Sequence, residues 1–381
     1  MKVALDATYS IGPNLSGVGV YSRAILFGLA QRHPEAEYSF CYRPHRFRQS
    51  FSETLPRNCR RAILWNGWPS SPDLFHGLNQ RIDSARYRRT VATFHDLFVM
   101  TGDYSTPEFR QRFTEQARTA AKRSDLIIAV SHFTAGQVEE LLKVEPARIR
   151  VVPHGARPLP WRGALAKPQL VSGQGRPARK PVANGRGSET LLLPSRDRKG
   201  AVVPERQQMI LFVGALQRRK NIVRLVEAFE ETASGWTLVL AGSLGFGAEE
   251  ILARIERSPR KADIQTPGYV PNTTLEELYQ RASVFAFPSL DEGFGLPVLD
   301  AMASGIPVLT SNASALTEVS GDAALLVDPL DAASIAAGLR KLTEDQTLRD
   351  ELVRKGVERS KEFTWEKSVE QTWNVYRELR V

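Results

Sequence analysis

Two carboxylates frame a short turn in the second half of the chain. Glu292 stands in the turn, and Asp300 follows it after seven intervening residues. The apolar run at 283–288 predicts a buried strand before the turn. Pro297 predicts a helix after it, because proline is well tolerated in the first turn of a helix. Two acids held between a strand end and a helix start can orient the hydroxyl groups of a sugar.

The backbone of the same turn is suited to bind anions. Gly293 and Gly295 allow a ligand to approach the main chain closely. The first N–H groups of the helix that begins near Leu296 have no partner within the helix and attract anionic oxygens. The segment therefore predicts a site for a charged, hydroxyl-rich ligand. The alternative is a strand–turn–helix unit that packs a sheet and binds nothing.

A group of cations precedes another predicted helix. Arg218, Arg219 and Lys220 lie between a predicted strand at 209–213 and a helix that starts at Asn221. Arg219 can bind phosphate oxygens through two N–H groups, while Lys220 supplies a point charge. These residues predict a diphosphate site, with a solvated basic turn as the alternative.

A glycine-rich loop at 12–19 follows the first predicted strand, and Gly17 and Gly19 open the next helix. Such a loop is an anion site in principle. Val18-Gly19 stands where a P-loop needs Lys and Ser or Thr, and Ser22 replaces the third glycine of a dinucleotide fingerprint. Neither of those two motifs is therefore indicated.

A histidine and an acid end the predicted strand at 90–94. His95 can act on a substrate, although a single histidine is often a structural group, and Asp96 could simply cap the next turn. No G-x-S-x-G elbow and no cluster of metal ligands occurs in the sequence. His76 and Asn79, after another short strand, are candidates to face an acceptor.

Together these motifs closely resemble those of the retaining, nucleotide-sugar-dependent glycosyltransferases of family 4, which have the GT-B fold. The Glu292…Asp300 pair resembles the signature of two glutamates separated by seven residues, with Asp in place of the second Glu. The Arg-Lys-Asn step at 219–221 resembles the segment that binds the donor diphosphate. His95-Asp96 resembles the segment that carries the family's active-site histidine.

The resemblance implies an enzyme that transfers a hexose, with mannose favoured, from a nucleoside-diphosphate sugar to a polysaccharide or a lipid-linked oligosaccharide. It implies retention of the anomeric configuration, no cofactor and no metal, and it assigns Asp300 to the ribose hydroxyls. The runs at 93–97 and 241–247 resemble members that use GDP-mannose. The implied catalytic residues are His95, Glu292 and Asp96. The implied donor-binding residues are Gly17, Gly19, Arg219, Lys220, Phe294, Gly295, Leu296, Asp300, Tyr269 and Val270.

Two alternatives stay open. One is another enzyme of the same fold, a nucleotide-sugar epimerase or a phosphorylase. The other is a non-catalytic protein that binds carbohydrate or nucleic acid, suggested by a basic segment in the middle of the chain.

The order of strands and helices predicts the fold. Strands alternate with helices in both halves, which is typical of a parallel sheet covered by helices. We therefore expect an α/β protein with two Rossmann-like domains that face each other across a cleft. Residues 1–155 would bind the acceptor and residues 209–363 the donor. Residues 156–208 would form a basic, largely disordered linker or insertion, and a helix at 364–381 would cross back to the N-terminal domain.

Composition and charge limit the possible functions. The 381 residues are 42% hydrophobic and 24% charged, and no apolar run is long enough to span a membrane. Two cysteines without paired spacing predict reduced thiols in the cytoplasm. The net charge is +9, but residues 156–209 alone carry 11 Lys or Arg against 3 Asp or Glu. Nucleic acid is thus not an expected partner. The arginines at 43–48 and 86–89 predict a solvated face or a peripheral contact with an anionic acceptor or the inner face of the plasma membrane.

Overall fold

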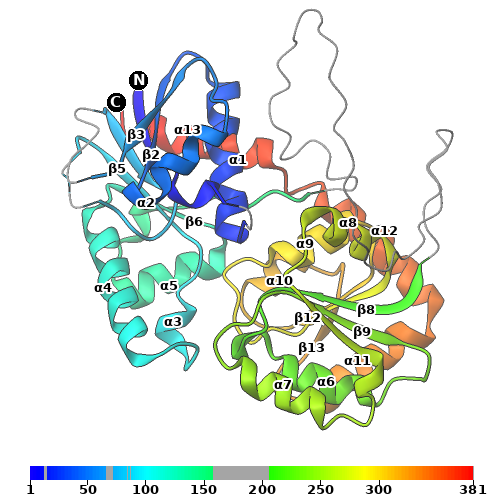
Figure 1. Cartoon of the computed structure of the whole chain (residues 1–381). Helices are drawn as coiled ribbons and strands as arrows, with labels where there is room; N and C mark the ends of the chain where they lie inside the picture. Colours follow the sequence, from blue (N-terminus) through cyan, green and yellow to red (C-terminus); the bar gives the residue numbers. More distant parts are fainter. Residues whose placement is uncertain (13–14, 66–71, 84, 86, 158–205, 381) are drawn as a thin grey trace, which may run out of the picture.

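The structure is a computed structural model. It describes residues 1–12, 15–65, 72–83, 85, 87–157 and 206–380. The segment predicted as a disordered insertion lies mostly outside these residues. Figure 1 shows two lobes, each built on its own sheet.

The N-terminal lobe contains a seven-stranded sheet in the order β3-β2-β1-β4-β5-β6-β7, in which every pairing is parallel. The central strands are buried because helices cover both faces of a parallel sheet. The strands are β1 (Lys2–Asp6), β2 (Glu37–Tyr42), β3 (Cys59–Ile63), β4 (Leu74–Gly77), β5 (Thr90–Phe94), β6 (Leu126–Ala129) and β7 (Ile149–Val151).

The C-terminal lobe contains a six-stranded parallel sheet in the order β10-β9-β8-β11-β12-β13. Its core includes Phe212, Phe285 and Phe287, each fully buried. The strands are β8 (Gln207–Val213), β9 (Thr237–Ala241), β10 (Ile264–Gly268), β11 (Ala282–Phe287), β12 (Val308–Ser311) and β13 (Leu325–Val327).

Several helices begin at a side chain that caps them. Ser16, Thr106, Ser131 and Thr364 each accept a hydrogen bond from a backbone N–H in the first turn of the helix that follows. The helices of the N-terminal lobe are α1 (Gly17–Arg32), α2 (Pro44–Phe47), α3 (Phe98–Thr101), α4 (Pro107–Arg123) and α5 (His132–Leu142). Those that follow are α6 (Ile222–Glu230), α7 (Ala248–Glu256), α8 (Asn272–Arg281), α9 (Leu296–Ala303), α10 (Ala315–Ser320), α11 (Ala332–Glu344), α12 (Gln346–Ser360) and α13 (Trp365–Glu378).

The last helix, α13, returns to the N-terminal lobe (Figure 1). Val369 and Tyr376 share a buried cluster with Leu5 and Tyr21. Helix α1 has a glycine where the two helices touch, since a Cβ at Gly28 would lie 2.4 Å from the Val369 side chain. The predicted two-domain α/β fold with a C-terminal helix that crosses back is therefore confirmed.

Helix α8 lacks the cap that its sequence suggests. The pattern Thr273-x-x-Glu276 is typical of a capping box, in which Thr273 would precede the helix. Instead α8 begins at Asn272 after Pro271, and no side chain caps it. Proline already holds the extended backbone that a helix needs just before its start.

Candidate active site

The cations and the first acid of the signature meet at the carboxyl ends of two neighbouring strands. Arg219 and Lys220 lie in a short 3-10 turn after β8, and Glu292 follows β11. The Arg219 Nη1 atom is 3.0 Å from Glu292 Oε2, and the Lys220 Nζ donates to Oε1. All three residues are less than 10% exposed. The structure thus joins two motifs that are separated by 72 residues.

The charges of this group are strongly coupled. Burial raises the pKa of the Glu292 carboxyl, but the neighbouring Arg219 and Lys220 charges outweigh that effect and lower it to about 2. Burial, and then repulsion from Arg219, lower the pKa of Lys220 to about 8. At neutral pH Arg219 and Lys220 are positively charged and Glu292 is negatively charged, and the nearby carboxyls of Asp96 and Asp291 also act on Arg219.

The last residue of the Arg-Lys-Asn step holds this turn in place. Asn221 adopts a left-handed conformation with φ of +59°, which asparagine tolerates better than most residues. Its side-chain amide donates to the carbonyl oxygens of Pro288 and Pro329 at 3.0 and 2.6 Å. Arg219 also donates to the Asp291 carbonyl oxygen at 2.7 Å. The cation turn is therefore bonded directly to the segment after β11.

His95 and Asp96 of the N-terminal lobe lie against the signature turn. A Cβ added to Gly293 would be 1.7 Å from the His95 carbonyl oxygen and 2.9 Å from the Asp96 Cβ. The close approach predicted at Gly293 is therefore, in this structure, an approach to protein backbone. The two predicted catalytic motifs are brought together from different domains.

The His95 ring has a defined tautomer. Its Nε2 lies 3.0 Å from the Leu78 carbonyl oxygen and must donate, which leaves Nδ1 as a hydrogen-bond acceptor. Burial lowers the pKa of His95 to about 4, so the ring is neutral. Burial raises the pKa of Asp96 to about 6, although Arg219 partly offsets the effect.

The N-termini of two helices meet beside this group. Gly17 opens α1 and Leu296 opens α9, and a Cβ at Gly17 would be 3.5 Å from the Leu296 side chain. Gly295 adopts a φ of +107° just before α9, which few other residues tolerate. Gly19 packs closely on the Tyr9 carbonyl oxygen. The Phe294 side chain is buried in an apolar cluster, so that residue can offer a ligand its backbone only.

Asp300 lies on α9 and is 1% exposed. Both of its carboxylate oxygens accept hydrogen bonds from Arg157, a residue in the connection between the two lobes. The predicted contact of Asp300 with a ribose stays a prediction.

The remaining candidates lie further away. Tyr269, which is 43% exposed, and Val270 follow β10, which is two strands from β8 at the edge of the sheet. The prediction that His76 faces an acceptor is wrong. Its ring is fully buried, with Nδ1 2.6 Å from the Tyr376 hydroxyl and Nε2 2.8 Å from the Thr93 hydroxyl.

Several residues of the site have no motif that would have marked them. Phe98 and Thr101 come from the short helix α3. The Arg219 guanidinium carbon lies 4.1 Å from the centre of the Phe98 ring, and Thr101 donates to Asp291 at 3.0 Å. His154 packs its ring on His95 with centroids 5.4 Å apart. Only Asp291, next to Glu292, could have been suspected from its position.

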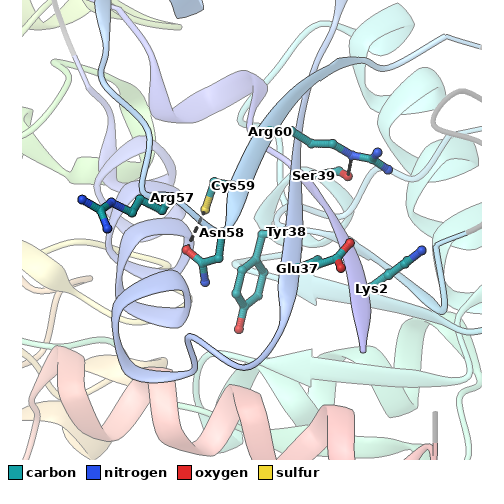
Figure 2. Close-up of a pocket in the computed structure, with 8 residues that line it drawn as sticks. All are labelled: Lys2, Glu37, Tyr38, Ser39, Arg57, Asn58, Cys59 and Arg60. Atoms are coloured by element: carbon teal, nitrogen blue, oxygen red, sulfur yellow. Dashed lines mark hydrogen bonds between the residues drawn. The ribbon is translucent and has the colours of Figure 1, made fainter.

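A pocket of about 340 Å³ lies elsewhere, where β1, β2 and β3 begin (Figure 2). Lys2, Arg57 and Arg60 line it together with Glu37. The strands run from this edge toward the predicted site, so the pocket is at the opposite end of the sheet. Within the described ranges, no group of three or more His, Cys, Asp or Glu side chains could hold a metal ion.

The parallel sheets, the paired lobes and the cations facing an acid define the chain as a glycosyltransferase with the GT-B fold. Family models agree with this assignment. The model for Glycosyltransferase Family 4 matches residues 17–158, and the model for Glycosyl transferases group 1 matches residues 195–359. The chain belongs to family 4 of the glycosyltransferases.

Curated relatives include mannosyltransferases. The chain is 30% identical to O-antigen chain mannosyltransferase B of Escherichia coli over 316 residues, which cover 80% of this chain and 74% of the relative. It is 28% identical over 305 residues to a D-inositol 3-phosphate glycosyltransferase of Salinispora tropica, of which it spans 58%.

Solved structures share the fold. Sucrose-phosphate synthase of Thermosynechococcus elongatus is 20% identical, with a TM-score of 0.70 over 100% of this chain and 99% of the other. WaaG, a glycosyltransferase involved in lipopolysaccharide biosynthesis, is 13% identical, with a TM-score of 0.68 over 98% and 99%. At these sequence identities the similarity supports a shared fold and nothing further.

Proposed function

We propose that this glycosyltransferase moves mannose from GDP-mannose to a polysaccharide or a lipid-linked oligosaccharide, with retention of configuration and without a metal ion. The observation that carries the proposal is the buried group of Arg219, Lys220 and Glu292, next to which Gly293 meets the His95–Asp96 segment of the other domain. The choice of mannose is supported by the mannosyltransferase relatives.

The chemistry follows from the charges. When the bond between the anomeric carbon and the diphosphate breaks, negative charge grows on the leaving phosphate. Arg219 and Lys220 stabilise that charge in a site from which water is largely excluded, where such stabilisation is strong. The first N–H groups of α1 and α9 add to it. Glu292 orients the two cations, and the neutral His95 can accept a hydrogen bond from a sugar hydroxyl through Nδ1.

The decisive test is a pair of substitutions at the cations. Lys220→Ala and Arg219→Ala should each lower kcat by about 100-fold or more, as is typical when one group that stabilises a transition state is removed. Lys261→Ala is the control, because Lys261 belongs to the same domain but its side chain is 55% exposed. Initial rates with GDP-mannose measure the effect, and wild-type turnover by Lys220→Ala would refute the proposal.

The donor and the stereochemistry need separate measurements. A thermal-shift screen against GDP-mannose, UDP-glucose, and ADP and TDP sugars identifies the donor, since a ligand that binds only the folded state raises the melting temperature. Proton NMR of the first product reports whether the anomeric configuration is retained. Turnover that EDTA abolishes and Mg²⁺ or Mn²⁺ restores would contradict metal independence.

Two alternatives have distinct outcomes. An epimerase would consume the donor without any acceptor, and a phosphorylase would require inorganic phosphate. A non-catalytic binder would show no turnover with any donor. Deletion of residues 160–205, which lie outside the described part of the chain, would abolish binding only if the basic segment were the binding site.

A further inference from the structure

Helix α3 of the N-terminal lobe places an aromatic ring on a cation of the other lobe. The guanidinium carbon of Arg219 lies 4.1 Å from the centre of the Phe98 ring. A guanidinium over an aromatic face is attracted by the negative charge of the π system, and the attraction is stronger where water is excluded. Arg219 is only 9% exposed, so this contact is largely desolvated. The Phe98 ring therefore supports one face of the guanidinium.

The edges of the same guanidinium are held unequally. Its Nη1 donates to the Asp291 carbonyl oxygen at 2.7 Å and lies 3.0 Å from Glu292 Oε2. Its Nε is buried and has no hydrogen-bond partner among the described residues. A buried N–H group without a partner is costly, which indicates that a ligand supplies the missing acceptor. With Nη1 fixed and one face covered by Phe98, the Nε edge is left in a defined orientation for an anionic oxygen.

Two further contacts seat this part of the N-terminal lobe on the C-terminal lobe. The Thr101 hydroxyl, at the end of α3, donates to the Asp291 carboxylate at 3.0 Å. Two residues later, the Asp103 carboxylate lies 3.5 Å from the Nη1 atom of Arg218. Asp291 and Arg218 are the chain neighbours of Glu292 and Arg219. The ring is thus brought to Arg219 where the two lobes meet.

The ring belongs to the same passage of chain as the predicted catalytic residues. His95 and Asp96 follow β5, and α3 begins at Phe98. One short passage of the N-terminal lobe therefore supplies both the predicted catalytic histidine and the ring that covers the cation.

We infer that Phe98 is a positioning residue, through which the N-terminal lobe holds the Arg219 guanidinium in the orientation that binds the donor diphosphate. The inference rests on the proposed function, because it takes Arg219 as a group that binds this diphosphate. It adds that a residue of the N-terminal lobe controls a charge of the donor site.

The first test asks whether Phe98 acts through Arg219. Phe98→Leu should lower kcat about tenfold in the wild-type background, as expected when a desolvated cation–π contact is lost. In the Arg219→Ala background the same change should lower the remaining kcat by less than about twofold, because the group that Phe98 positions is gone. Initial rates of the four proteins are measured with the donor that the thermal-shift screen identifies. Equal losses in both backgrounds would show that Phe98 only packs the lobe, and would overturn the inference.

The second test separates the charge of the ring from its size. Phenylalanines with one, two and three ring fluorines, introduced at position 98, keep nearly the same shape and weaken the attraction step by step. The kcat should fall in the same order, and Phe98→Tyr, which keeps the ring face, should stay within about threefold of the wild type. A flat fluorine series would contradict the inference. Phe109→Leu on α4 is the control, because that side chain is 47% exposed, and it should leave kcat unchanged.

A third measurement needs no substrate. For the same four proteins of the Phe98→Leu and Arg219→Ala cycle, the losses in melting temperature should be clearly non-additive, because the two side chains interact directly. Additive losses would refute the contact. If the wild type binds no nucleoside diphosphate and turns over no donor, the proposed function fails. The cycle in melting temperature still decides whether Phe98 and Arg219 interact.

Discussion

At the scale of single residues, the site is a set of buried ionisable groups whose charges shift one another's pKa values. Lys220 has a pKa of about 8 because burial and Arg219 disfavour its charge, while Glu292 favours it. Asp96 has a pKa of about 6, chiefly because it is buried. Two groups with pKa values on either side of neutrality are typical of catalytic sites.

The residue-scale prediction is a bell-shaped dependence of kcat/KM on pH, which reports the ionisable groups of the free enzyme. Below about pH 6 Asp96 becomes protonated and loses the negative charge that attracts Arg219. Above about pH 8 Lys220 loses its proton and with it the positive charge that stabilises the leaving phosphate. Rates measured from pH 5 to pH 9.5 should fall on both sides. In the Asp96→Asn variant, the remaining activity should no longer fall at low pH. If that fall persists, another group titrates there.

At the scale of elements, the turn between β11 and α9 has almost no free space. Gly293 faces the His95 backbone, and its carbonyl oxygen accepts hydrogen bonds from Ser131 and Thr134 at 2.7 and 3.0 Å. Both donors belong to the start of α5 in the other domain. This turn is therefore an interdomain contact as well as part of the site.

The element-scale prediction concerns a single methyl group at this turn. Gly293→Ala should lower kcat by at least tenfold, because the added Cβ overlaps the His95 carbonyl oxygen and must separate the two motifs. Gly136→Ala in α5 is the control: nothing lies within 4 Å of its Cβ, and alanine in a helix should stabilise the protein by about 0.5–1 kcal/mol. Unfolding curves and initial rates of both variants give the comparison; equal activities would show that the turn adjusts without cost.

At the scale of the whole molecule, the two domains touch directly. Glu318 of α10 accepts hydrogen bonds from the backbone N–H groups of His132 and Phe133, which begin α5. A carboxylate at this position also complements the dipole of α5. None of the helices described here is long and apolar enough to cross a membrane.

The whole-molecule prediction is that Glu318→Ala favours an arrangement in which the two domains lie further apart. Loss of a helix cap costs about 1 kcal/mol, which corresponds to roughly a fivefold shift toward separated domains. Small-angle scattering without ligand should give a larger radius of gyration than for the wild type, and GDP should reduce the difference. Glu344→Ala, at an exposed position on α11, is the control and should leave the radius unchanged.

Local patterns predicted elements whose apolar residues are contiguous. The strand at 90–94 was predicted with its observed bounds, and the helix expected to begin near Leu296 starts at that residue. Helix α4 was not predicted, because it buries only Ala117, Ala120 and Ala121, which make a weak apolar face. The edge strands β3 and β10 were also missed, since about half of each is polar or exposed.

The sequence by itself determined the class of fold, the motif that ends each central strand and the kinds of charge at the site, because these depend on residue types and short spacings. Only the tertiary structure decided which groups meet. Lys220 pairs with Glu292 over 72 residues, and Arg157 pairs with Asp300 over 143. Such pairings arise from the strand order of a sheet and from the path of the chain between two domains, and local sequence constrains neither.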